Sequence, residues 1–153
     1  MKPKVVVICG PTASGKTALS IELAKQINGE IVSADSMQIY KDMDIGTAKP
    51  TTEEMQGIQH YLLDFVLPDK RYSVAQYKQD AKKAIKTILE KGKVPILVGG
   101  TGLYVDSLIY EIEYNDIKLD EEYRKKLEDI VEKQGLEVLY EQAKKIDPQA
   151  MKK

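Results

Sequence analysis

The sequence predicts an α/β fold in which a parallel sheet with flanking helices is followed by a small helical region. Two observations lead to this prediction. Short apolar runs at Val5–Cys9 and Val94–Val98 are each followed by a turn rich in glycine, as in strands buried on both faces of a parallel sheet. The segments between them repeat apolar residues at helical spacing, and strands that alternate with helices favour an α/β sheet.

The composition is that of a globular protein. Of the 153 residues, 42% are hydrophobic and 31% are charged, unlike a disordered chain. The single cysteine excludes an internal disulfide framework and favours a reducing compartment, so we expect a cytoplasmic protein. The N-terminal apolar run is too short for a signal peptide or a membrane span, so no membrane association is expected. The net charge of −1 does not by itself suggest nucleic acid as a partner.

The first residues form a strand–loop–helix–strand unit. The helix is predicted over Lys16–Ile27, and Asn28 and Gly29 end it, because glycine adopts the left-handed conformation after a helix at little cost. A second strand is predicted over Glu30–Ala34, and it ends at Asp35. Such a unit argues for parallel strands joined by a crossover.

The middle of the chain contains one long helix. Asp42–Pro50 has no periodicity and is predicted to be a loop, and Tyr61–Phe65 is predicted to be a short strand. Ser73 with Gln76 three residues later resembles a capping box, in which each side chain satisfies the other residue's free backbone N–H group. The helix that follows carries one apolar stripe, and Gly92 ends it.

The C-terminal region differs in character from the rest. We therefore predict two domains, an α/β core over 1–113 and a truncated helical insert over 114–153. Within the insert, Asp120–Gln134 is a charged amphipathic helix and Leu136–Ile146 is a second amphipathic helix. Asp147-Pro148 is predicted to be the cap and first position of a third helix, since proline is tolerated where the N–H group is free.

The strongest motif is G-x-x-x-x-G-K-[ST], which lies after a predicted strand and before a predicted helix, the P-loop arrangement typical of nucleotide-binding and ATP-binding proteins. Its backbone N–H groups and the helix N-terminus would hold a diphosphate, Lys16 would supply charge, and the Thr17 hydroxyl would bind Mg²⁺. The motif leaves open whether the phosphate belongs to a nucleotide. The predicted phosphate-binding residues are Gly10, Pro11, Thr12, Ala13, Ser14, Gly15, Lys16 and Thr17.

Two further loops follow predicted strands, and in an open α/β sheet such loops share one crevice with the phosphate loop. Asp35 is a candidate general base, a candidate metal-anchoring acid like that of other P-loop enzymes, or a simple turn cap. Thr101, within Gly99–Gly102, offers a hydroxyl to a ligand, and the alternative is a tight turn between strand and helix. No acid ends the strand before Gly99, so Asp35 replaces the usual acid of P-loop NTPases or the chemistry is not NTP hydrolysis.

Several blocks of the sequence, taken together in the order in which they occur along the chain, resemble the tRNA dimethylallyltransferases. The resemblance implies transfer of a dimethylallyl group from dimethylallyl diphosphate to the N6 amine of the adenine just 3′ of the tRNA anticodon. It thus implies a transferase in tRNA processing, with a P-loop fold, Mg²⁺ as cofactor, and tRNA and dimethylallyl diphosphate as partners. We expect the protein to be a monomer. The matching blocks are Gly10–Thr17, Ser33–Tyr40, Met43–Pro50, Tyr72-Ser73 and Pro95–Tyr104.

The resemblance also implies roles for individual residues. Asp35 corresponds to the base that orients and deprotonates the amine, and Thr101 corresponds to a residue that contacts the substrate at the reacting centre. The family is about twice as long as this chain and its C-terminal half supplies basic tRNA-contacting motifs, so we expect the chain to be the N-terminal half of a longer protein. The implied tRNA-binding residues are Asp35, Ser36, Met37, Gln38, Thr101 and Arg124.

Three alternatives remain open. An adenylate isopentenyltransferase would prenylate a free nucleotide, and the helical insert favours tRNA over this alternative. A small-molecule P-loop kinase would use Asp35 as a base for a hydroxyl group. Such kinases normally carry a lid with arginines, and Arg71 and Arg124 are the only two arginines of this sequence. The third alternative is a binding fragment without activity of its own.

Overall fold

The computed structural model of the chain describes residues 4–110, 112, 114 and 120–152. Two compact units are present, Met1–Tyr114 and Asn115–Lys153. The domain boundary predicted at residue 113 lies outside the described residues. Within the described residues, no helix is long and apolar enough to cross a membrane.

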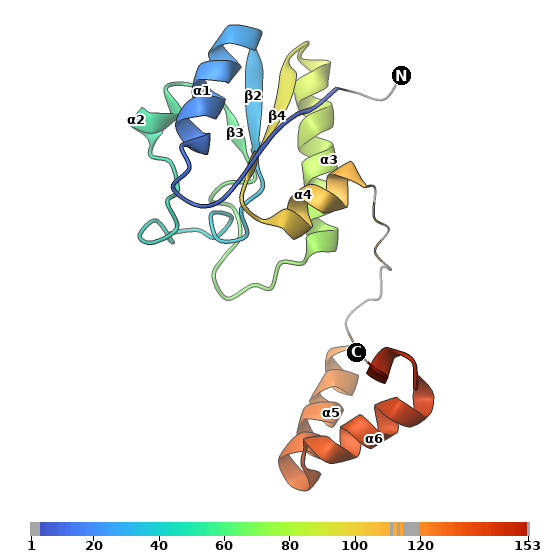
Figure 1. Ribbon diagram of the computed structural model, residues 1–153. Helices are drawn as coiled ribbons and strands as arrows, with labels where there is room; N and C mark the ends of the chain where they lie inside the picture. Colours follow the sequence, from blue (N-terminus) through green and yellow to red (C-terminus); the bar gives the residue numbers. More distant parts are fainter. Residues whose placement is uncertain (1–3, 111, 113, 115–119, 153) are drawn as a thin grey trace. The chain divides into compact units, whose positions relative to one another are not determined.

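The first unit contains a four-stranded parallel sheet, which confirms the predicted fold class (Figure 1). The strand order is β1-β4-β2-β3, so β4 and β2 are central. The strands span Val6–Cys9 (β1), Gly29–Ser33 (β2), His60–Tyr61 (β3) and Val94–Gly99 (β4).

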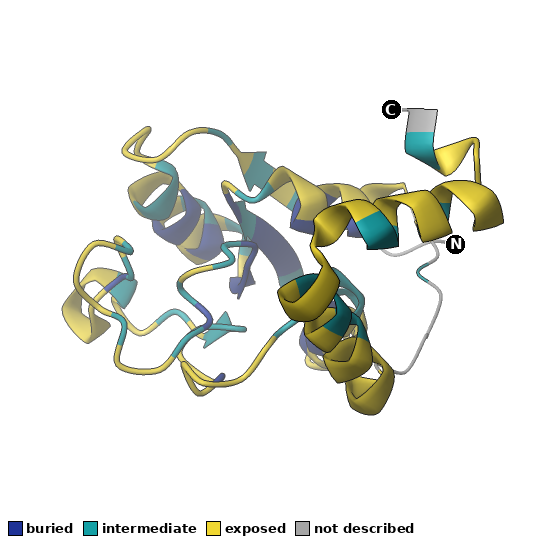
Figure 2. Ribbon diagram, turned by 90° about the horizontal axis from the view of Figure 1, so that it is seen from below, coloured by how far each residue is buried: buried dark blue, intermediate teal, exposed yellow. Residues whose placement is uncertain are grey.

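Helices cover both faces of this sheet. α1 (Lys16–Ile27) packs on one face through Ile21 and Ala24, which meet Ile31 and Ile96. α3 (Val74–Glu90) and α4 (Gly102–Ile109) pack on the other face. Figure 2 shows the buried residues gathered on the central strands and on the helix sides that face them. Successive residues of β2 and β4 alternate between these two cores, because side chains of a strand point to opposite faces.

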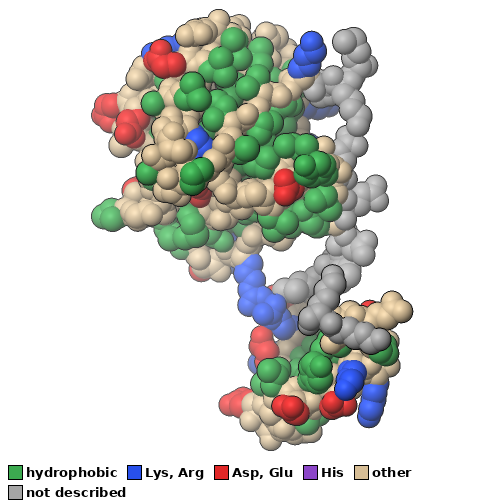
Figure 3. Space-filling model, viewed as in Figure 1, with side chains coloured by type: hydrophobic (Ala, Val, Ile, Leu, Met, Phe, Trp, Pro, Cys, Tyr) green, Lys and Arg blue, Asp and Glu red, His purple; other side chains and the backbone are tan. Residues whose placement is uncertain are grey.

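β1 differs from the prediction of a strand buried on both faces. Among the strands of the described residues, it lies at an edge of the sheet and pairs with β4 alone. Its residues alternate between partly buried and exposed, with Val7 36% exposed and Cys9 exposed. Figure 3 shows apolar side chains gathered on the face where β1 and α4 lie in front. The prediction was wrong because an apolar, β-branched run indicates a strand but does not reveal how many neighbours the strand has.

The short strand predicted over Tyr61–Phe65 is also shorter than expected. β3 ends at Tyr61, and Leu62 and Asp64 both have left-handed backbones, with φ of 58° and 57°. A left-handed residue cannot continue an extended strand. Pairing resumes only as an isolated bridge between Tyr40 and Val66.

The predicted helix ends are mostly confirmed. Ser73 and Gln76 form the capping box, with Ser73 Oγ accepting from Gln76 N at 3.2 Å and Gln76 Oε1 accepting from Ser73 N at 2.8 Å. At the end of α1, however, Asn28 takes the left-handed conformation and Gly29 begins β2. Gly29 has a different role, since a Cβ there would lie 2.7 Å from Ile96 Cδ1.

The second unit is helical, as predicted. It contains α5 (Glu121–Gln134) and α6 (Leu136–Ile146), and Asp120 Oδ1 caps α5 by accepting from Tyr123 N at 2.9 Å. Asp147 Oδ1 accepts from the N–H groups of Gln149 and Ala150. The segment that it caps is a short 3₁₀ helix, Ala150–Lys152, in place of the predicted α-helix.

A buried carboxylate lies on β2, at the opposite end of the strand from Asp35. Glu30 is only 3% exposed. It accepts hydrogen bonds from Lys93 Nζ at 2.8 Å, Tyr61 Oη at 2.8 Å and Lys91 Nζ at 3.1 Å. Burial alone would raise the pKa of Glu30, but the hydrogen bonds from Lys93, Tyr61 and Lys91 outweigh it and hold the pKa below 4.5.

We expect Glu30→Gln to lower the free energy of unfolding by about 1–2 kcal/mol at neutral pH, because the neutral amide cannot replace the charge-assisted bonds from Lys93, Lys91 and Tyr61. Since the folded-state pKa is lowered, this stabilisation is fully present above the unfolded pKa of 4.5 and is lost as the pH falls through the folded value. Urea unfolding of both proteins across a pH series measures the difference. A difference that stays constant down to strongly acid pH would contradict the ion-pair account.

Candidate active site

Three loops meet at the carboxyl edge of the sheet. In the parallel register, Cys9 of β1 is opposite Gly99 of β4, and Ser33 of β2 is opposite Val98. The phosphate loop follows β1, the Asp35 turn follows β2 and the Thr101 turn follows β4. The sequence therefore correctly predicted that these segments lie together, because the strands end at the same edge.

The phosphate loop has the geometry of an anion cradle. Ala13 and Gly15 have left-handed backbones, with φ of 63° and 82°, which turns successive N–H groups toward one side. Gly15 is the N-cap of α1, and no side chain caps the first N–H groups of this helix. Lys16 Nζ donates to the Pro11 carbonyl at 2.5 Å, so the ammonium lies across the loop. Free N–H groups at a helix N-terminus beside an ammonium favour a phosphate.

Asp35 forms a tight turn with the residues after it. Its Oδ1 accepts from Met37 N at 2.9 Å and from Gln38 N at 3.3 Å. This is the capping interaction that the sequence offered as one interpretation, and it involves one of the two carboxylate oxygens. The cap therefore fixes the orientation of the carboxylate, and it leaves Oδ2 as an oxygen that a substrate can contact.

Thr101 binds the same turn from β4. Its Oγ1 accepts from Ser36 N at 3.0 Å and lies 3.3 Å from Ser36 Oγ, and its N–H group donates to the Ala34 carbonyl at 3.1 Å. Gly99 permits this approach, because a Cβ there would lie 2.1 Å from the Ala34 oxygen. Close packing of chain on chain thus explains Gly99, whereas the sequence offered close approach to a ligand.

A cavity of about 690 Å³ opens between the phosphate loop and the Asp35 turn. Gly10, Pro11, Ser36 and Thr101 are not among the residues that line it. Its size suits a small molecule or one flipped-out base. The cavity is lined by residues 12–18, Ile21, Asp35, Met37, Gln38, residues 46–50, Glu54, Gln56 and residues 98–100.

Two stacked tyrosines support the Asp35 turn from the face of the sheet that α3 and α4 cover. The rings of Tyr77 (α3) and Tyr104 (α4) lie 3.9 Å apart at an interplanar angle of 11°. Tyr77 Oη donates to the Ser33 carbonyl at 3.0 Å, two residues before Asp35. Burial, with Tyr40 and Asp35 nearby, raises the pKa of Tyr104. Both phenols therefore stay neutral at physiological pH, and the support beneath the carboxylate is uncharged.

The donor set of the cavity fits Mg²⁺. Among the described residues, no group of three or more His, Cys, Asp or Glu side chains could hold a metal ion. Thr17 and Asp35 line the same cavity. Mg²⁺ favours oxygen ligands and is commonly held by one or two side chains together with phosphate oxygens and water. A hydroxyl at the start of α1 beside a phosphate cradle meets that requirement.

The comparisons with known proteins identify the family. The model of the IPP transferase family matches residues 38–153. The chain belongs to the IPP transferase family. It is 54% identical over its whole length to the tRNA dimethylallyltransferase of Thermoanaerobacter sp. (strain X514), of which it covers 49%. Over 149 residues it is 60% identical to that of Acetivibrio thermocellus, covering 97% of this chain and 48% of the relative.

Solved structures of the family agree. The full-length tRNA isopentenylpyrophosphate transferase of Bacillus halodurans matches with a TM-score of 0.73 and 50% identity, covering 98% of this chain and 50% of that one. A eukaryotic dimethylallyltransferase acting on tRNA matches with a TM-score of 0.80 and 34% identity, covering 98% of this chain and 37% of that one. The chain spans about half the length of the curated relatives it matches.

Arg124 lies on α5 of the second unit of this IPP transferase chain. Its guanidinium pairs with Glu128 at 3.0 Å, one helical turn later, and its side chain is partly exposed. Its predicted contact with tRNA stays a prediction, as do the roles assigned to Asp35, Thr101 and the phosphate loop.

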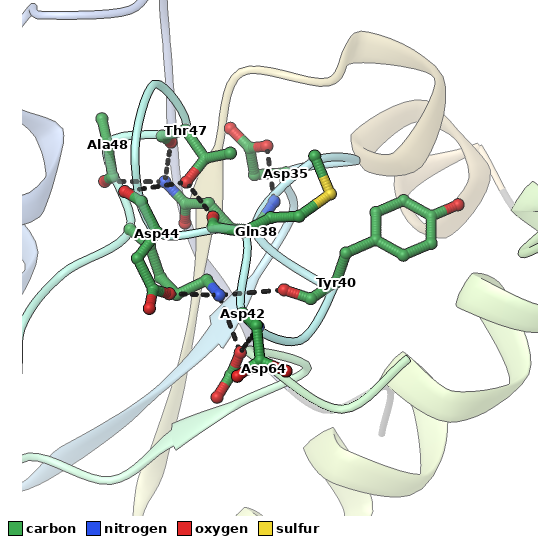
Figure 4. A network of polar contacts seen from close by, with 10 residues as sticks. Asp35, Gln38, Tyr40, Asp42, Asp44, Thr47, Ala48 and Asp64 are labelled. Atoms are coloured by element: carbon green, nitrogen blue, oxygen red, sulfur yellow. Dashed lines mark hydrogen bonds and ion pairs between the residues drawn. The ribbon is translucent and has the colours of Figure 1, made fainter. Parts of the chain in front are cut away.

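Sequence reasoning missed several residues of the IPP transferase cavity. The segment 42–50 was predicted only as a loop, yet residues 46–50 line the cavity. Lys49 and the Gln38 amide hold this segment in place through a network of polar contacts (Figure 4). Glu54 and Gln56, at the short helix α2 (Thr52–Met55), also line the cavity. Two signals were available: the acids Asp42 and Asp44 near Lys49, and the resemblance of Met43–Pro50 to the family. Neither indicated a contact with the cavity, because exposed charges in a loop are usually solvated.

Proposed function

We propose that the protein carrying this chain transfers a dimethylallyl group from dimethylallyl diphosphate to the N6 amine of the adenine 3′-adjacent to the tRNA anticodon. The observation that carries the proposal is the single cavity shared by the phosphate loop and the Asp35 turn, in a chain that belongs to the IPP transferase family. The relatives' names, tRNA dimethylallyltransferase and dimethylallyltransferase acting on tRNA, supply the substrate class.

The phosphate loop receives the donor in this proposal. The C–O bond of the allylic diphosphate breaks, and its electron pair leaves with the diphosphate. Lys16 and the N–H groups of the loop and of the first turn of α1 stabilise the negative charge that develops there. Mg²⁺, held by Thr17 and the phosphate oxygens, would supply further charge to the leaving group.

The Asp35 turn receives the acceptor. The amine nitrogen forms a bond to the allylic carbon and loses a proton to Asp35, whose orientation is fixed by the N–H groups of Met37 and Gln38. Thr101 holds the turn through Ser36. An adenine reaches such a cavity only when it leaves the base stack, and Met37, exposed on the cavity wall, offers an apolar surface for it.

The second unit contacts the tRNA in this proposal. Arg124 can exchange the exposed Glu128 for a phosphate group, because a surface pair within one helix is weak. We expect a cytoplasmic protein, because the proposed substrate is tRNA, and we expect it to be a monomer.

One experiment separates this function from a kinase and from an adenylate isopentenyltransferase, and an absence of label in every product would indicate a binding protein without activity. The complete protein is incubated with dimethylallyl diphosphate labelled in the prenyl group, ATP labelled in the γ-phosphate, unmodified tRNA and free AMP. We expect the prenyl label in tRNA. A γ-phosphate label in any product indicates a kinase, a prenyl label in AMP indicates an adenylate isopentenyltransferase, and either result would overturn the proposal.

A further inference from the structure

Lys49 is a buried lysine with no role in the chemistry described above. Its side chain is 6% exposed although it lies in a loop. Its ammonium donates to Asp44 Oδ1 at 2.7 Å, Asp64 Oδ1 at 2.7 Å and the Tyr40 carbonyl at 2.9 Å. An ammonium has three N–H groups, so these three acceptors saturate it. Lys49 lines the cavity, yet it has no proton left to donate to a phosphate.

The acceptors of Lys49 come from different parts of the chain. Tyr40 follows the Asp35 turn, Asp44 belongs to the 42–50 loop, and Asp64 follows β3. Asp64 Oδ1 also accepts from Asp42 N at 3.3 Å, and Asp64 N donates to the Gln38 carbonyl at 3.0 Å. One cation therefore connects the Asp35 turn, the segment after β3 and residues 42–50, which we call the rim of the cavity. Figure 4 shows Asp42, Asp44, Tyr40 and Asp64 converging on this point.

The Gln38 amide fastens the rim at a second point. Its Nε2 donates to the carbonyls of Thr47 at 3.1 Å and Ala48 at 2.9 Å. Ala48 has a left-handed backbone, with φ of 51°. Alanine rarely adopts this conformation, so surrounding contacts must hold it. The rim is therefore held in an unfavourable backbone conformation by Gln38 and Lys49, which indicates that its shape matters.

The charges of the network agree with a locked arrangement. Burial alone would lower the pKa of Lys49, but the hydrogen bonds that Lys49 donates to Asp44 and Asp64 outweigh it and raise the pKa. The hydrogen bond from Lys49 is the main reason why the pKa of Asp64 is lowered. The Lys49–Asp64 ion pair therefore stays charged across the whole physiological pH range.

We propose that Lys49 is a positioning residue for the acceptor: it fixes the rim formed by residues 42–50 against the Asp35 turn, so that the base entering the cavity meets the carboxylate in a reactive orientation. This inference rests on the proposed function. It assigns Lys49 to the acceptor and not to the diphosphate, although the phosphate loop lines the same cavity. A small displacement of a reacting group is costly in rate even when the mutated residue never touches the substrate.

The test compares Lys49→Met with Lys86→Met in the complete protein. Lys86 lies on the outer face of α3, where it is 78% exposed and pairs only weakly with Glu90, so Lys86→Met removes the same charge away from the cavity. For Lys49→Met we expect kcat for prenyl transfer to tRNA to fall about tenfold. The rate is divided by the number of diphosphate-binding sites, which calorimetry counts, so that unfolded protein does not lower it. The expected loss is smaller than the roughly 10²-fold that a displacement of 1 Å can cost, because we expect the rim to move by less than that. The diphosphate affinity stays unchanged, and amide hydrogen exchange in 42–50 becomes faster. Lys86→Met changes none of these.

The possible outcomes are distinct. If the diphosphate affinity falls as much as kcat, Lys49 contacts the donor. If kcat is unchanged and the rim stays ordered, Lys49 only stabilises the fold. Each of these two results overturns the proposal. Should Lys49→Met fail to fold, Asp64→Asn decides, since Asp64 is half exposed and Asn keeps an acceptor oxygen. We then expect a fall in kcat of about two- to threefold, and no fall overturns the proposal. Failure of the proposed function would instead appear as absence of transfer by the unsubstituted protein.

Discussion

Replacing Asp35 by Asn is expected to lower kcat for prenyl transfer by about 10²–10⁴-fold with little change in stability. Asn keeps an Oδ1 oxygen that can accept from Met37 N and Gln38 N, as Asp35 does at 2.9 and 3.3 Å, and it caps turns about as well as Asp. The carboxamide cannot take the proton of the amine. Single-turnover transfer with saturating tRNA isolates the chemical step.

Asp80→Asn is the matched control for this prediction. Asp80 lies on α3, where its Oδ2 accepts from Tyr72 Oη at 2.9 Å. Asp80 does not line the cavity. We expect Asp80→Asn to react at nearly the unsubstituted rate. An Asp35→Asn protein that reacts within a few-fold of the unsubstituted rate would leave Asp35 as a cap alone, and the proton would then pass to another group or to water.

The second large effect is expected at the phosphate loop. Lys16→Ala should weaken the binding of dimethylallyl diphosphate by about 10- to 100-fold, because one charge-assisted contact in a partly desolvated cradle is lost. Lys16 is the first residue of α1, and alanine has the highest helix propensity, so the helix persists. Isothermal titration calorimetry measures the affinity.

Lys25→Ala is a control within the same helix. Lys25 lies in the last turn of α1, where it pairs with Glu22 at 3.3 Å and donates to Gln56 Oε1; Lys25 itself does not line the cavity. It carries the same charge outside the phosphate loop, so its loss should leave the diphosphate affinity unchanged. Equal affinities for the Lys16→Ala and unsubstituted proteins would remove the loop from the account of donor binding.

Local patterns predicted most of the fold and the meeting of the three loops at one edge of the sheet. The phosphate loop depends on residue types at fixed spacing, and the meeting of three loops follows from parallel strands that end at one edge. The capping box at Ser73 and Gln76 is likewise a local feature. The phosphate loop and the capping box involve residues within a few positions of one another, and the meeting of the three loops needs only the rule for parallel strands, so these features can be read from a single sequence.

The features that could not be predicted depend on distant parts of the chain. The exposed β1 follows from strand order. Gly29 and Gly99 are explained by close approach of Ile96 and Ala34, not by left-handed backbones. Lys49 meets Asp64 across a separation of fifteen residues. In each case the sequence gives the residue type, but the partner is known only once the chain has folded.

The central claim is that one cavity brings a prenyl diphosphate to the exocyclic amine of an adenine. The most direct measurement is a single-turnover reaction of the complete protein with tRNA and with the same tRNA carrying purine riboside, which lacks that amine, 3′ of the anticodon. We expect one dimethylallyl group on that adenine and one diphosphate released per group transferred, and neither product with purine riboside. Prenyl transfer to the purine riboside tRNA or to another nucleotide, or diphosphate release without transfer, would contradict the account.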